Sequence, residues 1–274
     1  SNYGFDTQMI HAGFEPDRET HSMVPPIYMT NAYSFDSTEH AKTLFELKAP
    51  GNIYSRLSNP TNDVLENRIA QLDGGIGALS FASGHAAIIG TILNLAQEGD
   101  EFVSSNTIYG GAVNLFGVTL ARMGIKVRFV DADDLGAWEA AINEKTRALF
   151  FEVVGNPNAN VADADAIAAL GKKYGIPVIM DSTFTTPYLF RPIEHGADFV
   201  IHSATKFLCG HGNSMAGIVV DSGRFPFEGN PRFPLYNDPD PSYHGLKFAT
   251  DFGNAGGIAG LGALFYVAYR VWQS

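Results

Sequence analysis

The feature that most constrains the fold is an alternation, between residues 78 and 220, of short apolar runs with segments that carry apolar residues at helical spacing. Strands that alternate with helices pair in parallel, because each helix returns the chain across the sheet. We therefore expect an α/β fold with a mostly parallel central sheet covered by helices on both faces. The predicted strands are Ala78–Ala82, Glu101–Ser104, Lys126–Val130, Ala148–Val153, Val178–Met180, Phe199–Ile201 and Met215–Val220, and the predicted helices between them are Gly84–Gln97, Gly111–Met123, Leu135–Ile142 and Asp163–Tyr174.

The segments on either side of this alternation have a different pattern. Residues 1–60 show little periodicity and are predicted to form an extended N-terminal arm. A helix should follow Asn59-Pro60-Thr61 and end at Gly74-Gly75. Residues 61–250 should then form one large α/β domain, in which the Pro-rich and aromatic stretch 223–243 is a connection. Residues 251–274 are expected to begin a small C-terminal domain that is largely absent from this chain.

Composition argues against several classes of function. The chain has 18 Lys and Arg against 29 Asp and Glu, a net charge of −11, so nucleic-acid binding through a basic face is not expected. The single cysteine, Cys209, excludes an intrachain disulfide, favours a cytoplasmic location and is expected to be a small core residue. No signal peptide is expected at the N-terminus. The nearly uncharged run 255–268 is shorter than the roughly 18–20 residues of a membrane span, which favours a buried or subunit-facing helix.

A lysine follows the last parallel strand of this pattern. Ser203-Ala204-Thr205-Lys206 comes directly after the predicted strand Phe199–Ile201 and His202. In open α/β sheets, ligands bind beyond the carboxyl ends of the strands. The two hydroxyls could hold a phosphate while the amine forms a Schiff base with an aldehyde, the combination that pyridoxal phosphate (PLP) needs. Taken alone, the tetrapeptide is better explained by a surface turn with an exposed lysine, because short motifs match by chance.

Other strand ends carry groups that suit the same cofactor. Asp181 ends an apolar run and would keep a pyridine nitrogen protonated, although it could instead cap the following turn. The helix that opens at Ser83-Gly84-His85 offers free N–H groups and a dipole to a phosphate, although Ser83 could be only an N-cap. Tyr109 could stack on an aromatic ring or move protons, or it could belong to the core.

Metal and dinucleotide binding have little support. His85, His195, His202 and His211 do not have the spacing of metal ligands, so no metal site is predicted. Gly74-Gly75-Ile76-Gly77 does not complete a Gly-x-Gly-x-x-Gly pattern after a strand, which argues against a dinucleotide site.

Together the motifs resemble those of the Cys/Met-metabolism family of PLP enzymes, which have the aspartate-aminotransferase type fold (fold type I). The resemblance runs from about Thr7 to Phe252. Its motifs are Ile10-His11-Ala12-Gly13, Gly51-Asn52-Ile53-Tyr54-Ser55-Arg56, Asn59-Pro60-Thr61, Ser83-Gly84-His85-Ala86-Ala87, Tyr109-Gly110-Gly111, Gly155-Asn156-Pro157, Asp181-Ser182-Thr183, Pro192-Ile193-Glu194-His195-Gly196-Ala197-Asp198, Ser203-Ala204-Thr205-Lys206 and Gly210-His211-Gly212.

The resemblance implies a role for each matching residue. Lys206 would form the Schiff base with PLP and shuttle protons, and Asp181 would pair with the pyridinium nitrogen, with Thr183 beside it. A further set would surround the rest of the cofactor: Ser83, Gly84, His85 through its backbone, Ser203 and Thr205 at the phosphate, Tyr109 on the ring and Asn156 near the ring hydroxyl. Tyr54 and Arg56 would reach the phosphate of a neighbouring subunit, which implies an active-site dimer within a homotetramer.

Within the family, the motifs favour the O-acetylhomoserine sulfhydrylase branch, and Gly111 stands where methionine γ-lyases typically carry a cysteine. The resemblance thus implies replacement at the substrate γ-carbon, which joins sulfide, a small thiol or carrier-delivered sulfur to O-acetyl-L-homoserine in methionine biosynthesis. A methionine γ-lyase or a cystathionine γ-synthase-like enzyme is the alternative within the family, and a noncatalytic PLP-binding assembly subunit is the alternative outside it. The arginine that binds the substrate carboxylate in this family cannot be assigned to any residue of this chain.

Overall fold

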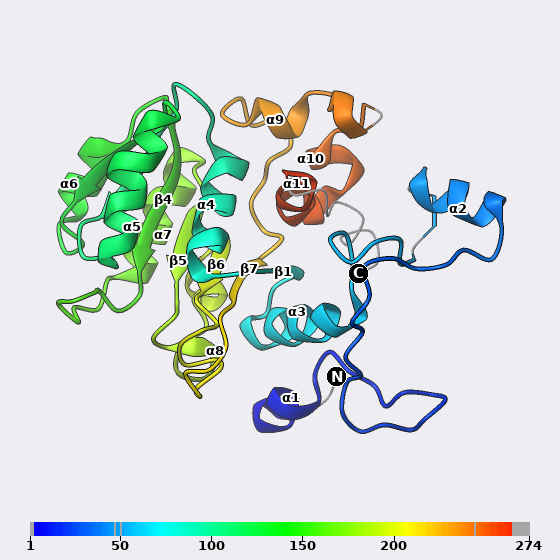
Figure 1. Cartoon of the computed structure of the whole chain (residues 1–274). Coiled ribbons are helices and arrows are strands. Elements are labelled where there is room, and N and C mark those ends of the chain that lie inside the picture. The colour runs from blue at the N-terminus through cyan, green and yellow to red at the C-terminus, as the bar shows by residue number, and fades with distance from the viewer. Residues whose placement is uncertain (1–2, 47, 50, 244, 265–274) are drawn as a thin grey trace.

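The fold is built around one mixed sheet of seven strands in the order β1-β7-β6-β5-β4-β2-β3 (Figure 1). It is seen in a computed structural model that describes residues 3–46, 48–49, 51–243 and 245–264. The strands are β1 (Gly77–Phe81), β2 (Glu101–Ser105), β3 (Lys126–Val130), β4 (Thr146–Glu152), β5 (Val178–Asp181), β6 (Phe199–His202) and β7 (Gly217–Asp221). Strands β2 to β6 pair in parallel, and β7 runs antiparallel to both β1 and β6. The predicted mostly parallel sheet is confirmed.

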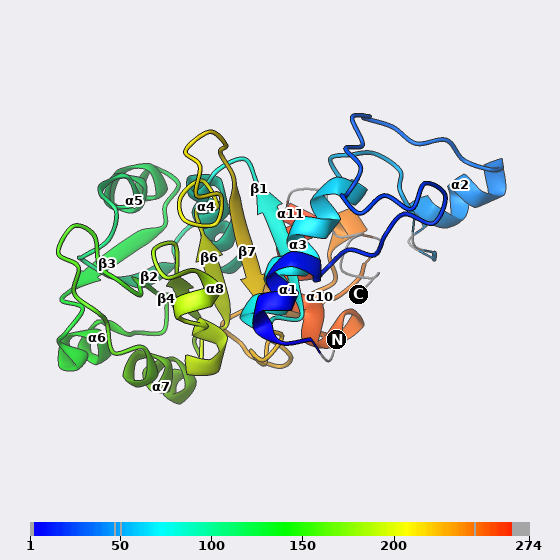
Figure 2. The ribbon, with the colours of Figure 1, turned by 90° about the horizontal axis from the view of Figure 1, so that it is seen from below.

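Helices cover both faces of the sheet. Figure 2 shows α4 and α5 on one face and α6 and α7 on the other. The helices are α1 (Phe5–His11), α2 (Thr38–Phe45), α3 (Pro60–Asp73), α4 (Gly84–Leu95), α5 (Gly110–Asn114), α6 (Leu135–Ala141), α7 (Ala164–Tyr174), α8 (Thr186–Leu189), α9 (Pro234–Asn237), α10 (Phe248–Asp251) and α11 (Gly256–Leu264). The predicted helix Gly111–Met123 is divided, because a π-helical segment at Leu115–Leu120 follows α5.

Alternate side chains of the central strands pack on opposite faces, as the pleat of a strand requires. In β4, Ala148 and Phe150 belong to the core beneath α4 and α5, whereas Leu149 and Phe151 belong to the core beneath α6 and α7. All four are buried. The two cores explain why these strands appear in the sequence as continuous apolar runs rather than as alternating patterns.

Local signals set the ends of the helices that support the site. The Asn59 side chain accepts a hydrogen bond from the Thr61 N–H at 2.9 Å, so α3 begins where it is predicted to begin. The same helix ends at Gly74, which has a φ of 80° in the left-handed region that glycine adopts without strain. The Ser83 hydroxyl caps α4 by accepting from the Ala86 N–H at 3.1 Å.

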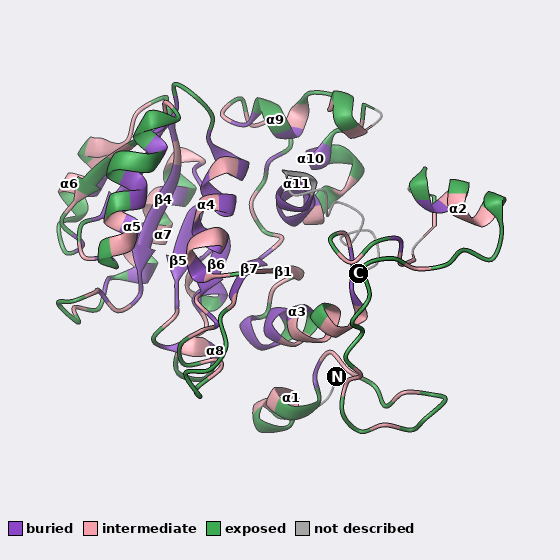
Figure 3. Ribbon diagram, viewed as in Figure 1, coloured by how far each residue is buried: buried purple, intermediate pink, exposed green. Residues whose placement is uncertain are grey.

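Three expectations, for the arm, for the stretch 223–243 and for Cys209, need correction. The arm is extended and largely exposed (Figure 3), but it includes the helices α1 and α2, which were too short to give a periodic signal. The stretch 223–243 is more than a connection, because it includes α9 and packs aromatic rings together. The rings of Phe227 and Tyr236 are stacked, with their centroids 3.9 Å apart. Cys209 is half-buried rather than a core residue, because it lies in the loop after β6.

The expected buried helix near the end of the chain is present as α11. Residues 256–262 of this helix are buried against the sheet and α4. No helix in the described ranges is long and apolar enough to cross a membrane. The remainder of the run, and the rest of the expected C-terminal segment after Leu264, lies outside the described residues.

Candidate active site

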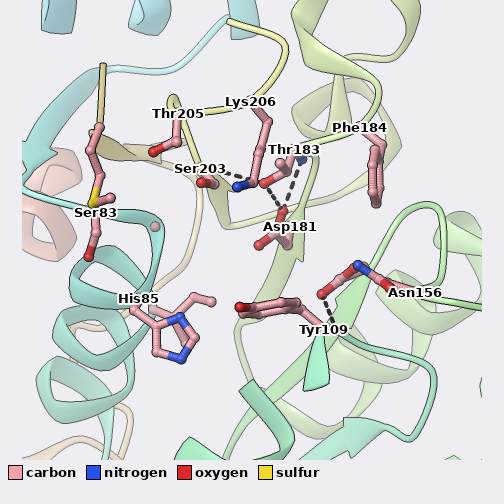
Figure 4. A pocket seen from close by; sticks show the side chains of 14 residues that line it. Ser83, His85, Tyr109, Asn156, Asp181, Thr183, Phe184, Ser203, Thr205 and Lys206 are labelled. Atoms are coloured by element: carbon pink, nitrogen blue, oxygen red, sulfur yellow. Dashed lines mark hydrogen bonds between the residues drawn. The ribbon is translucent and has the colours of Figure 1, made fainter. Parts of the chain in front are cut away.

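A pocket of about 230 Å³ opens at the carboxyl ends of the parallel strands, where the sheet topology predicts a ligand site. It contains all the predicted cofactor residues except Tyr54 and Arg56. The residues that line it are Ser83, Gly84, His85, Ile88, Tyr109, Glu152, Asn156, Asp181, Thr183, Phe184, Ser203, Thr205, Lys206 and Met215. Figure 4 shows Lys206, Asp181 and Tyr109 around one common space.

The N-terminus of α4 forms one side of the pocket, and tight packing holds it there. A Cβ atom on Gly84 would lie 2.7 Å from the Ser203 Cβ atom, so this position has no room for a side chain. The Thr205 hydroxyl lies 3.1 Å from both the backbone oxygen and the backbone nitrogen of Ala216, which fixes the loop after β6. Backbone N–H groups at the start of α4 and nearby hydroxyls are the groups that bind a phosphate.

Asp181 lies on the floor of the pocket in a fixed orientation. Its Oδ1 atom accepts hydrogen bonds from the backbone N–H of Thr183, at 2.9 Å, and from the Thr183 hydroxyl. That hydroxyl in turn accepts from the Ser203 N–H at 2.8 Å, so it ties the end of β5 to the end of β6. Burial raises the pKa of Asp181, against the opposing effects of the Thr183 hydrogen bonds and of attraction to His202. A cation such as a pyridinium would favour the ionised form.

Glu152 is a pocket residue that the sequence analysis missed. It ends β4 directly beside Asp181 on β5, and its Oε1 atom accepts a hydrogen bond from the Tyr109 N–H at 2.6 Å. Burial and repulsion from Asp181 raise the pKa of Glu152 to about 8. The available signal was an acidic residue at the end of an apolar run, the same signal that identified Asp181. Phe184 and Met215 were also missed, and their aromatic and apolar side chains gave no comparable signal.

Tyr109 offers an open aromatic face to the pocket. Its side chain is half-exposed and its ring meets His85 edge-on, with ring centroids 5.6 Å apart. Gly111 makes this arrangement possible, because a Cβ atom there would lie 2.5 Å from Tyr109 Cε1 and 2.8 Å from His85 Cε1. A ring stacked on Tyr109 would lie between Tyr109 and the opposite wall of the pocket.

Two predicted residues lie elsewhere. Tyr54 and Arg56 belong to the arm, where the Arg56 guanidinium lies 5.6 Å from the centre of the Tyr54 ring, and neither lines the pocket. Within the part of the chain that the structure describes, no group of three or more His, Cys, Asp or Glu residues is arranged to hold a metal ion.

The groups in the pocket fit PLP. An amine reaches into the space from Lys206, a buried carboxyl faces it from Asp181, and a helix N-terminus with hydroxyls forms one wall. The absence of a side chain at Gly84 lets the start of α4 pack closely against Ser203, which brings the helix N-terminus and a hydroxyl together.

Comparison with known proteins agrees with this chemistry. A family model described as "Cys/Met metabolism PLP-dependent enzyme" matches residues 6–237. The chain is 46% identical over 270 residues to an O-acetyl-L-homoserine sulfhydrylase of Leptospira meyeri, and 48% identical over 252 residues to a homocysteine synthase of Schizosaccharomyces pombe. These alignments cover 98% and 91% of this chain but 61% and 59% of the two relatives. The chain thus spans about three fifths of the length of these curated relatives.

Two solved structures share the fold. A putative O-acetylhomoserine (thiol)-lyase from Campylobacter jejuni has a TM-score of 0.90 and 37% identity, with 99% of this chain and 70% of that chain covered. Its crystals contain N′-pyridoxyl-lysine-5′-monophosphate, which is a lysine joined to the cofactor. A cystathionine γ-lyase from Lactobacillus plantarum, complexed with L-serine, has a TM-score of 0.77 and 30% identity, with 99% and 63% covered.

Proposed function

The chain belongs to the Cys/Met-metabolism family of PLP-dependent enzymes, and on that premise we propose that the protein containing it joins sulfide, a small thiol or a carrier-delivered sulfur to O-acetyl-L-homoserine. The products would be homocysteine or methionine, and acetate. The observation that carries the proposal is that Lys206, Asp181 and Tyr109 line one pocket. The chain that forms this pocket is 45–49% identical to sulfhydrylases and homocysteine synthases.

Each side of the pocket would have a separate task. The start of α4, with Ser203 and Thr205, would bind the phosphate of PLP, and Tyr109 would lie against the ring. Asp181 would hold a proton at the pyridine nitrogen. Once bound, PLP supplies an electron-withdrawing ring that stabilises negative charge at the substrate α-carbon. Lys206 would attach the cofactor and, as a free amine beside the substrate, take up and return a proton at that carbon.

The net reaction exchanges one bond at the substrate γ-carbon. The carbon–oxygen bond to the acetyl group breaks, and acetate leaves with the electron pair. A carbon–sulfur bond forms in its place, and the proton of the thiol is released. Tyr109 lines the pocket with a half-exposed side chain, and its phenol would assist the proton movements at the substrate.

Elimination without replacement is the competing activity within the family. Gly111 supports replacement, because methionine γ-lyases typically carry a cysteine at this position. A side chain here would also require the rings of Tyr109 and His85 to move. Measuring acetate release with and without thiol separates the two activities. Thiol-dependent release supports the sulfhydrylase, whereas abundant 2-oxobutyrate from methionine would support a lyase.

Substitution of Lys206 tests the proposal directly. In the full-length protein, Lys206→Ala should abolish the yellow colour of bound cofactor and lower the rate of thiol-dependent acetate release by ~10³-fold. Lys145→Ala is the matched control, because Lys145 is exposed and lies outside the pocket. Survival of both colour and turnover in Lys206→Ala would overturn the assignment. Normal cofactor binding with no turnover in the unaltered protein would favour the noncatalytic assembly subunit.

A second copy of the chain is proposed to complete the site. The arm presents exposed apolar side chains, among them Ile27 and Met29 at 77% and 93% exposure, and it carries Tyr54 and Arg56 away from the chain's own pocket. Packing of this arm on a partner would bury those side chains and bring the guanidinium to the partner's phosphate site. We further propose a homotetramer built from such dimers, and a cytoplasmic location, which the single free cysteine supports.

A further inference from the structure

A fully buried ion pair lies behind the pocket floor. His202 is the last residue of β6 and Asp73 is the last residue of α3. The His202 Nε2 atom lies 2.7 Å from the Asp73 Oδ2 atom, and both side chains are completely shielded from solvent. Neither residue lines the pocket, and the proposed reaction assigns neither of them a role.

The hydrogen bonds of the imidazole fix where its protons lie. The Nδ1 atom is 3.2 Å from the backbone oxygen of Ser182, which can only accept, so Nδ1 carries a proton. The other nitrogen faces a carboxylate, and a second proton there makes the pair an imidazolium and a carboxylate. The Asp73 Oδ1 atom is buried without a hydrogen-bond partner among the described residues, so His202 is the main group that compensates this carboxylate.

Two carboxyl groups act on His202 from the elements packed around it. Asp73 approaches from α3, and Asp181 acts from the adjoining strand β5. Burial by itself would lower the pKa of His202, but attraction and hydrogen bonding to Asp73 and attraction to Asp181 outweigh it and raise the pKa. The interaction is mutual, since the same charge acts to lower the pKa of Asp181.

The pair is also connected to Asp181 through the chain. Ser182, whose carbonyl accepts from His202, directly follows Asp181, and its N–H donates to the Ile201 oxygen at 2.8 Å. We propose that His202, held as an imidazolium by Asp73, is a positioning residue that keeps the Asp181 carboxylate ionised and in place for the pyridine nitrogen of PLP. This inference rests on the proposed role of Asp181 but not on the identity of the substrate.

A purely structural role for the pair predicts a different result. The pair joins α3 to the sheet, so its loss would weaken cofactor binding to the same extent at every pH. The proposed role adds a pH dependence. Without the neighbouring imidazolium the pKa of Asp181 is higher, so acidification protonates Asp181 sooner and weakens PLP binding.

The experiment measures the equilibrium dissociation constant of PLP in the full-length protein, stripped of cofactor, between about pH 5 and about pH 9. Asp73→Asn with His202→Asn is the main variant, because it removes both charges and leaves no buried carboxylate without a partner. It also keeps an amide that can donate to the Ser182 oxygen. His195→Asn is the matched control, because His195 forms an exposed pair with Asp165 at 3.0 Å, outside the pocket.

The double variant should bind PLP about tenfold more weakly at the acidic end of the range and approach wild-type affinity at the alkaline end, which corresponds to a shift of about one pH unit. The His195→Asn profile should match the wild type. A double variant with a wild-type profile, or with an equal loss at every pH, would overturn the inference.

Asp181→Asn separates this inference from the assignment of the cofactor site. It should weaken PLP binding and remove the part of the pH dependence that Asp181 contributes, because no titrating carboxyl then remains at that position. Wild-type binding by Asp181→Asn would refute the role of Asp181 itself, and with it the inference. If Asp181→Asn behaves as expected while the double variant resembles the wild type, the inference about His202 alone fails.

Discussion

At the scale of single residues, two carboxyl groups at the ends of neighbouring strands have different surroundings. Burial raises the pKa of Asp181, but two hydrogen bonds from Thr183 and attraction to His202 oppose this effect and favour the ionised form. Glu152 accepts one hydrogen bond, from the Tyr109 N–H, and burial and Asp181 raise its pKa to about 8. The protonated form of Glu152 is therefore favoured in the cofactor-free pocket, where its side chain holds the backbone of Tyr109.

The raised pKa of Glu152 predicts how stability changes with pH. The folded state keeps a proton on Glu152 that the unfolded state releases above a pKa of 4.5, so this contribution is complete below pH 4.5 and is lost as pH rises through about 8. Glu152→Gln keeps a neutral acceptor for the Tyr109 N–H and has no proton to lose. Between about pH 4.5 and about pH 8, the unfolding free energy of the wild type should fall by on the order of 2–4 kcal/mol through this effect. Glu152→Gln should not show this fall.

Urea unfolding of the cofactor-free, full-length protein at several pH values checks this expectation. Glu144→Gln is the control, because Glu144 is exposed and its substitution should leave the pH slope unchanged. Parallel pH profiles for Glu152→Gln and the wild type would show that Glu152 is ionised in the folded state.

The sequence predicts those site residues that directly follow a strand, because the strand itself is recognisable as an apolar run. Lys206, Asp181 and Ser83 each follow an apolar run, and the rule that ligands bind at strand ends places them together. The roles of Glu152 and His202 depend instead on which elements become neighbours. The contact of His202 with Asp73 joins residues 129 positions apart, and no local pattern predicts it.

At the scale of elements, the pocket depends on close contact between the start of β7 and the start of α4. A Cβ atom on Gly217 would lie 2.1 Å from the Ser83 backbone oxygen and 2.8 Å from the Gly84 nitrogen. These are backbone atoms, so they cannot move aside as a flexible side chain can. The position of the helix N-terminus, and of the phosphate site that we propose there, therefore depends on a glycine in the neighbouring strand.

Gly217→Ala should displace the start of α4 and disturb the phosphate site. We expect a loss of about 3 kcal/mol in unfolding free energy, as for other overpacked sites, together with weaker PLP binding. Gly110→Ala is the matched control, because a Cβ atom there meets nothing within 4 Å. Calorimetry and a PLP titration on both variants check the expectation, and wild-type values for Gly217→Ala would contradict the close packing.

Elements were predictable where burial repeats along the chain. The predicted strand Lys126–Val130 matches β3, and the other strands agree to within a few residues at each end. The helices α1 and α2 were missed, because they are short and contact the rest of the chain through few buried side chains. The aromatic packing of 223–243 was missed because it depends on α10 and α11, which lie later in the chain.

At the scale of the whole molecule, the arm and the body have opposite character. The sheet and its covering helices are buried around two cores, whereas the arm extends away from them (Figure 1) and is largely exposed (Figure 3). Its exposed residues include the apolar Ile27 and Met29. Exposed apolar surface of this kind marks an interaction site. If Arg56 acts at a partner's phosphate site, its loss should weaken PLP binding about 10–100-fold, the effect of losing charged hydrogen bonds.

Mixed subunits test whether the arm acts on its own chain or on a partner. Lys206→Ala and Arg56→Ala subunits, each impaired alone at limiting PLP, are co-expressed with different tags and purified through both. In a hybrid dimer, the Lys206 of one chain meets the Arg56 of the other, so one site is complete. Up to roughly half of wild-type activity should return, because each hybrid dimer selected through both tags has one complete site of its two.

The control for this test pairs Lys206→Ala with Asp181→Asn. Both residues belong to the same pocket, so every site in that hybrid lacks one of them and no activity should return. Recovery with Arg56→Ala and not with Asp181→Asn would place the arm at a partner's site. If neither hybrid recovers although both assemble, Arg56 serves its own chain or no site at all, and the exposed apolar side chains of the arm need a different partner.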